Sequence, residues 1–149
     1  MIKSYPQDFD QNGTLGIKLP FNAKLAGSKS GIFNMSHTTE DQAVSNYINL
    51  LLTKKGERYM QPDFGVGLYY YLFENNTDLY QLTLKNEIQR QSGIWLPYIF
   101  NNSIEIKDYS GSGINGIQIY INFSVTETGA NRIIRIFPGV DNTIDIEVG

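Results

Sequence analysis

Three acidic side chains in the middle of the chain could take part in acid–base chemistry: Glu57, Asp63 and Glu74. Glycoside hydrolysis needs two carboxyl groups, one held protonated and the other ionised across a cleft. The sequence shows no pattern that pairs two of them at one site, and Glu57 beside Arg58 fits an ion pair or a loop contact equally well. We therefore expect no catalytic residue, and the chain is predicted not to be an enzyme.

His37 is the only histidine, and the chain contains no cysteine. The lack of cysteine excludes disulfides, thiolate metal sites and cysteine nucleophiles, and a single histidine near a helix start is typical of a solvated surface group. The segment 111–116 reads Gly-Ser-Gly-Ile-Asn-Gly, which matches a dinucleotide-binding fingerprint. That fingerprint requires a helix after it, whereas alternating strand patterns flank this segment and predict a hairpin turn. No cofactor or metal site is predicted.

The composition is that of an ordinary folded domain: 149 residues, of which 41% are hydrophobic. The net charge of −3 lies wholly in residues 98–149, because residues 1–97 carry nine basic and nine acidic groups. No basic stripe is present, so nucleic-acid binding is not favoured. The first residues contain no apolar run, so we expect neither a signal peptide nor contact with a membrane, and a protein that remains inside the cell.

We interpret residues 1–149 as a single domain with three parts: an extended arm (1–37), a helical half (38–97) and a β-sheet half (98–149). A capping box at Thr39–Gln42, followed by apolar residues at helical spacing, predicts a helix over about 39–54. A short aromatic helix is expected over 68–73. A third helix is expected after the cap in 75–78 and is predicted to end near Ser92-Gly93.

Beyond Pro97 the apolar residues alternate with polar ones, which predicts a meander of three antiparallel strands. The fold class is therefore α+β: an N-terminal arm, about three helices, then an antiparallel β-sheet of three or four strands. The last segment, 143–148, also alternates. It either completes this sheet or offers its edge to another chain, with Ile144, Ile146 and Val148 facing the core and Asp145 and Glu147 facing outward.

One stretch is far more specific than the rest: Leu52-Thr53-x-x-Gly56-Glu57-Arg58-x-Met60-x-Pro62-x-Phe64-Gly65-x-x-Leu68, followed by Leu72-Phe73-Glu74. Upstream of it stands Gly16-Ile17-x-Leu19-Pro20-Phe21. Together these residues closely resemble the baseplate wedge and sheath-initiator family of contractile phage tails, whose relatives occur in type VI secretion baseplates. The resemblance covers residues 14–100 and extends to the following sheet through the order of elements. Some members of that family are labelled lysozyme-like.

The motif can also be interpreted from the chemistry of its residues alone, without the family resemblance. Gly56 would end the first helix, Arg58 would donate to loop carbonyls or a carboxylate, and Pro62 would fix the turn. The apolar side chains of Met60, Phe64 and Leu68 are expected to return to the core. The Glu-Pro-Arg signature common in the family is replaced here by Trp95-Leu96-Pro97-Tyr98, where we expect an apolar contact or a cover for the sheet. The candidate wedge contacts are Thr53, Gly56, Glu57, Arg58, Met60, Pro62, Phe64, Gly65, Leu68, Trp95, Pro97 and Tyr98.

The resemblance implies a structural component of a contractile-tail baseplate, present in six copies, located in the virion tail and assembled in the host cytoplasm. Its implied partners are wedge proteins and the tail sheath protein, with tube or hub proteins as further candidates. The candidate sheath contacts are Ile144, Asp145, Ile146, Glu147 and Val148. Two alternatives stay open: a component of a type VI secretion or related injection apparatus, and a peptidoglycan-cleaving muramidase.

Overall fold

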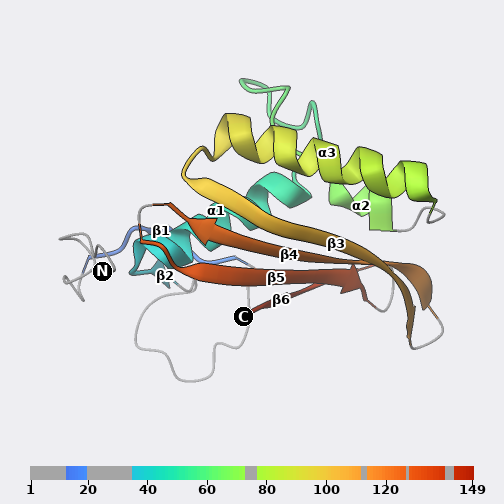
Figure 1. Cartoon of the computed structure of the whole chain (residues 1–149). Helices are drawn as coiled ribbons and strands as arrows, with labels where there is room; N and C mark the ends of the chain where they lie inside the picture. Colours follow the sequence, from blue (N-terminus) through green and yellow to red (C-terminus); the bar gives the residue numbers. More distant parts are fainter. Residues whose placement is uncertain (1–12, 20–34, 73–76, 112–113, 127, 140–142) are drawn as a thin grey trace.

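The structure is a computed structural model of the chain, and it describes residues 13–19, 35–72, 77–111, 114–126, 128–139 and 143–149. Three helices lie over one face of a four-stranded antiparallel sheet (Figure 1). The α+β class expected from the sequence is therefore confirmed. No helix in the described part of the chain is both long and apolar enough to cross a membrane.

The first helix, α1, spans Thr39–Leu52 and packs its apolar stripe into the core. Its N-cap is Thr38, whose Oγ1 accepts a hydrogen bond from the Asp41 amide at 3.2 Å, so the predicted cap at Thr39 is wrong by one residue. Thr38 takes the cap because its backbone is extended, with φ −118°, whereas Thr39 is already helical. Thr53 ends the helix, and its Oγ1 donates to the Asn49 carbonyl at 2.6 Å.

Two further helices follow the motif. The short helix α2 spans Leu68–Leu72, and α3 spans Asp78–Trp95 with Thr77 as its N-cap. The predicted end of α3 near Ser92-Gly93 is early, because the helix continues through the glycine and the Leu96 amide still donates to the Ser92 carbonyl at 2.8 Å. A glycine costs a helix only about 1 kcal/mol. Packing of Trp95 against Phe64 can offset a cost of that size.

The sheet contains four strands in the order β3-β4-β5-β6. They span Ile99–Gly111, Ile114–Val125, Asn131–Pro138 and Ile144–Val148, and each pairs antiparallel with the next. The predicted meander is confirmed, and so is the hairpin between β3 and β4; its residues 112–113 lie outside the described part. Two short strands of the predicted arm, β1 (Gly16–Ile17) and β2 (Met35–Ser36), pair with each other beside α1. The described ends of the arm therefore form a small sheet.

The core lies between the helices and one face of the sheet. On β4, the five alternating residues from Ile117 to Val125 are fully buried. Tyr47 of α1 meets Phe123 edge-on at 4.9 Å and donates from its hydroxyl to Asn101 of β3 at 2.6 Å. This packing holds α1 against the sheet. The motif begins at Leu52, the last residue of α1.

Candidate functional site

The motif loop, residues 56–63, is closed by its own backbone. The Gly56 amide donates to the Pro62 carbonyl at 2.8 Å, across the neck of the loop. Gly56 has φ +81°, a left-handed conformation that glycine adopts without strain. Beyond the tip, the Gln61 amide donates to the Arg58 carbonyl, and the Phe64 amide donates to the Gln61 carbonyl, both at 3.1 Å. The backbone therefore holds a defined shape.

The two charged residues of the motif have structural partners within the chain. The Glu57 carboxylate accepts a hydrogen bond from the Lys54 amide at 3.0 Å, just after the end of α1. The guanidinium carbon of Arg58 lies 3.7 Å from the centroid of the Phe64 ring. Phe64 in turn packs edge-on against Trp95 at 5.4 Å, so the motif meets the second group of candidate residues at the end of α3.

Gly65 is required by close backbone packing. Its φ is +111°, and a Cβ placed there would lie 2.2 Å from the Thr53 carbonyl oxygen. No side chain fits so close to a backbone atom. The next residue, Val66, donates from its amide to the Leu50 carbonyl at 3.0 Å, which draws the chain back beneath α1 before α2 begins at the buried Leu68.

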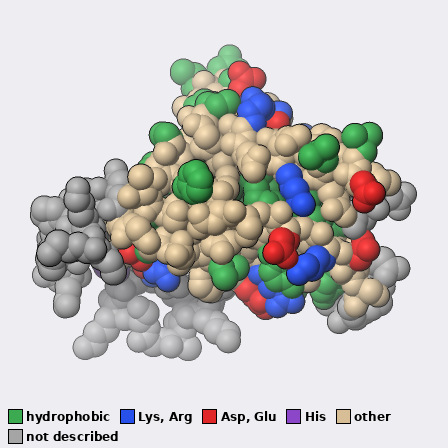
Figure 2. All heavy atoms as spheres, in the orientation of Figure 1, with side chains coloured by type: hydrophobic (Ala, Val, Ile, Leu, Met, Phe, Trp, Pro, Cys, Tyr) green, Lys and Arg blue, Asp and Glu red, His purple; other side chains and the backbone are tan. Residues whose placement is uncertain are grey.

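Met60 does not return to the core, so that expectation is wrong. Its side chain is 87% exposed and the neighbouring Tyr59 is 96% exposed, whereas Phe64 and Leu68 are buried as expected. The closed neck of the loop accounts for this, because it turns the residues at the tip away from the helices. Figure 1 shows the segment between α1 and α2 protruding beyond α3, and Figure 2 shows hydrophobic, acidic and basic side chains gathered on that protrusion.

A polar cluster on α3, which the sequence interpretation missed, holds the motif loop. Glu87 lies 2.5 Å from the ammonium of Lys55 and 2.9 Å from the guanidinium of Arg90, and it accepts from Gln91 at 3.1 Å. These contacts, the one with Arg90 foremost, lower the pKa of Glu87 to about 2. The buried Gln91 also donates to the Asp63 carbonyl at 3.0 Å. The three- and four-residue spacing of Glu87, Arg90 and Gln91 is the signal that could have revealed this cluster.

The segment that replaces the Glu-Pro-Arg signature turns the chain from α3 into β3. Leu96 is buried, and the Tyr98 hydroxyl accepts a hydrogen bond from the Asn46 amide group of α1 at 2.9 Å. The Tyr98 carbonyl accepts from the Thr126 amide at 2.8 Å. Trp95 and Tyr98 are thus engaged inside this chain, and Pro97 is exposed.

Strand β6 pairs with β5 and completes this protein's own sheet, which is one of the two readings of residues 143–148. The other reading, strand addition by another chain, would use the outer edge of β6. Ile133 and Gly149 exchange two backbone hydrogen bonds of 2.9 Å, and the register then pairs Arg135 with Glu147. In an antiparallel pair, hydrogen-bonded positions alternate. The amides and carbonyls of Ile144, Ile146 and Val148 therefore point away from β5. No described strand pairs with this outer edge.

The side chains of β6 follow the expected alternation only in part. Ile144 and Ile146 are half-buried and pack on the core, while Asp145 and Glu147 are exposed. Glu147 forms an ion pair of 2.9 Å with Arg135 on the outward face. Val148 pairs with the buried Ile134 and so lies on the core side of the sheet, as expected, although its side chain is 45% exposed. It lies at the end of the last strand, where little of the core remains to cover it.

The acidic residues that could support hydrolysis are exposed wherever the structure describes them. Glu57 and Asp63 are exposed, and Glu74 lies outside the described residues. The carboxyl group that the fold perturbs most clearly, Glu87, has a lowered pKa, which is the opposite of what a general acid requires. His37 has its Nδ1 3.0 Å from the Gly13 carbonyl oxygen. Within the described ranges, no group of three metal-binding side chains comes together.

The fold is shared with known proteins. The family model described as baseplate wedge protein gp25 matches residues 38–130. The anti-feeding prophage baseplate contains a chain of similar fold, with a TM-score of 0.59 and 18% identity over 76% of this chain and 86% of that one. A Geobacter sulfurreducens protein, provisionally named a tail lysozyme, has a TM-score of 0.51 and 19% identity over 75% and 90%. No curated protein matches the chain.

Proposed function

This chain belongs to the baseplate wedge protein gp25 family, and on that premise we propose that it joins wedge proteins and starts the tail sheath. It is a structural component of a contractile-tail baseplate. The proposal adds two surfaces to this role: the outer edge of β6 for the sheath protein, and the tip of the motif loop for wedge proteins. Six copies per baseplate, assembled in the host cytoplasm, are part of the same proposal.

The observation that carries the proposal is the outer edge of β6, with which no strand in the described part of the chain pairs. Three residues, Ile144, Ile146 and Val148, direct their backbone amides and carbonyls away from β5. Such an edge is a template for strand addition, in which main-chain hydrogen bonds supply affinity. The first sheath subunit would add a strand here and extend the sheet of this chain into the sheath.

The experiment replaces one amide on that edge. Ile146→Pro removes an outward N–H while leaving the hydrogen bonds of Glu147 to β5 in place, and Ile146→Ala is the matched control because it loses the same side chain. Baseplates carrying Ile146→Ala should nucleate sheath, whereas those carrying Ile146→Pro should remain bare in electron micrographs. If folded Ile146→Pro baseplates carry sheath as often as Ile146→Ala baseplates do, strand addition at β6 is refuted.

The loop tip supports the wedge-joining part of the proposal. Tyr59 and Met60 expose nearly all of their side chains, beside the half-buried Arg58, on a loop closed at its neck. Aromatic, methionine and arginine side chains are enriched in protein interfaces, and a rigid loop loses little entropy on docking. The double variant Tyr59→Ser, Met60→Ser should fold with an unchanged melting temperature and fail to enter baseplates. Normal incorporation of that variant would contradict the role of the tip.

A muramidase is the alternative from another class, and a cell-wall clearing assay separates it from the structural role. The purified chain should leave a peptidoglycan suspension turbid. Glu57→Gln should behave identically, because the Glu57 carboxylate has a structural role as the acceptor of the Lys54 amide. Clearing that depends on Glu57 would replace the structural proposal with an enzymatic one. A type VI secretion or related injection apparatus is the alternative within the same class, and the neighbouring genes distinguish it from a phage tail.

A further inference from the structure

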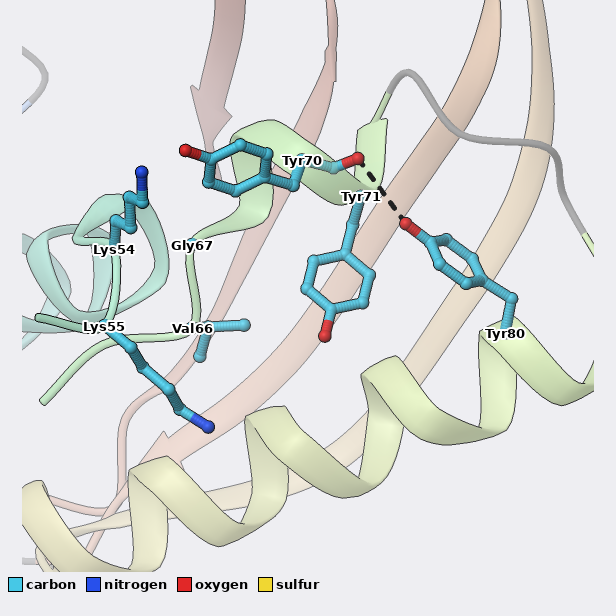
Figure 3. Close-up of a pocket in the computed structure, with 7 residues that line it drawn as sticks. All are labelled: Lys54, Lys55, Val66, Gly67, Tyr70, Tyr71 and Tyr80. Atoms are coloured by element: carbon cyan, nitrogen blue, oxygen red, sulfur yellow. Dashed lines mark hydrogen bonds between the residues drawn. The ribbon is translucent and has the colours of Figure 1, made fainter. Parts of the chain in front are cut away.

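An open pocket of about 390 Å³ lies between the end of α1, the start of α2 and the first turn of α3 (Figure 3). Its volume is within the range of pockets that hold small ligands or a few side chains. It is lined by residues on the helical side of the motif, away from the exposed tip of the loop and from β6. Neither proposed assembly surface uses it.

The interior of the pocket is apolar and aromatic. Val66 and Gly67 line it from the chain that leads into α2, and the rings of Tyr71 and Tyr80 pack against each other with centroids 5.1 Å apart. The Tyr80 hydroxyl donates to the Tyr70 carbonyl at 3.5 Å, which links α3 to α2 (Figure 3). A side chain entering the pocket would therefore meet aromatic faces whose positions are already fixed.

One side of the pocket carries a positive charge. The ammonium of Lys54 lies 4.9 Å from the centroid of the Tyr70 ring, and no described carboxylate lies within ion-pair distance of it. Glu57 affects it only at longer range, since its carboxylate accepts from the Lys54 amide. Hydrogen bonding to Tyr70 raises the pKa of Lys54, so the ammonium stays charged at neutral pH. Lys55, in contrast, is paired with Glu87.

We propose that this pocket binds an acidic segment of a neighbouring baseplate protein, with a carboxylate on Lys54 and an apolar side chain against Tyr71 and Tyr80. A cation that no described carboxylate pairs with, beside aromatic walls, suits one carboxylate joined to an apolar group. A phosphate dianion fits less well, because Lys55 is already paired with Glu87 and its second negative charge would meet the partial negative charge at the C-terminal end of α1 without a cation of its own. This inference rests on the proposed function, because the partner is a protein of the same baseplate.

Zero-length coupling with a carbodiimide tests the contact in assembled baseplates. The reagent joins an amine to a carboxylate as an amide, with loss of water, only when the two groups are in contact. Each cross-linked product therefore identifies both residues of a contact. Two ion pairs inside the chain serve as positive controls: Lys18 with Asp41 and Lys55 with Glu87, each 2.5 Å apart. We expect a further amide bond from Lys54 to an aspartate or glutamate of another chain, identified by mass spectrometry.

Matched variants make the outcome decisive. Lys55→Arg removes the neighbouring amine and should leave the intermolecular product intact, whereas Lys54→Arg keeps the charge and should abolish that product completely. Both lysines are exposed and both variants keep the positive charge, so neither variant should change the melting temperature. If both control pairs couple and Lys54 gives no product with another chain, the pocket does not bind an acidic segment. If the chain is missing from purified baseplates altogether, the proposed function itself fails, and the two failures are thus distinct.

Discussion

The guanidinium carbon of Arg58 lies 3.7 Å from the centroid of the Phe64 ring, and Trp95 packs edge-on against the same ring at 5.4 Å. The charged part of the motif is therefore attached to the end of α3 through one aromatic ring. This relationship explains how a loop with an exposed apolar tip keeps its shape, and it gives the first of the predictions.

Removing the cation should destabilise the chain only when the ring is present. Arg58→Ala should lower the free energy of unfolding by about 1 kcal/mol, the size of a partly exposed cation–π contact. In a Phe64→Leu background the same change should cost much less, because its partner is gone. Urea unfolding of the four proteins measures the coupling. Equal losses of the free energy of unfolding in the two backgrounds would show that Arg58 stabilises the chain through contacts other than the Phe64 ring.

Two glycines of the motif should differ sharply in their tolerance of alanine. Gly65→Ala places a Cβ 2.2 Å from the Thr53 carbonyl oxygen at φ +111°, so we expect a loss of about 3 kcal/mol or a failure to fold. Gly56→Ala is the matched control, since it also has a positive φ but nothing within 4 Å, and it should cost about 1 kcal/mol. Thermal unfolding gives the order, and a larger loss at Gly56 would contradict the packing at Gly65.

Stability should fall in acid through Glu87. Its pKa is lowered from 4.5 to about 2 in the folded chain, so the ionised form stabilises the fold at neutral pH, by less than the full shift because solvent screens the exposed Lys55 and Arg90. That contribution is complete above the unfolded pKa and is lost as the pH falls from about 5 towards 2. Glu87→Gln should flatten the pH dependence of unfolding over this window. Glu105→Gln, at an exposed ion pair, should change it little, and an unchanged slope in Glu87→Gln would refute the assignment.

Periodicity in the sequence was sufficient to predict the helices and strands that bury one regular face. The alternation from Ile117 to Val125 predicted β4, and the apolar spacing from Val44 to Leu51 predicted α1. The helix boundaries shifted by one to three residues at Thr38 and Trp95, where capping geometry and an aromatic contact outweighed the local signals.

The candidate site was less accessible to sequence reasoning, because its contacts join distant segments. Met60 is an apolar residue, yet the hydrogen bond from the Gly56 amide to the Pro62 carbonyl closes the loop and leaves the Met60 side chain exposed to solvent. The spacing of Glu87, Arg90 and Gln91 indicates a cluster on α3, but the contacts of that cluster with the motif loop depend on α3 passing beneath it, which no local pattern specifies. The pairing of β6 with β5 also needed the structure, since alternation alone permits a partner in either chain.

The most direct test of the proposed function is a cryo-EM reconstruction of the assembled baseplate with its first sheath ring. We expect a strand from a sheath subunit to run alongside β6 at a spacing of about 4.8 Å, hydrogen-bonded to the backbones of Ile144, Ile146 and Val148. An outer edge of β6 that faces solvent, or that is covered by a side-chain contact without main-chain pairing, would contradict the proposal.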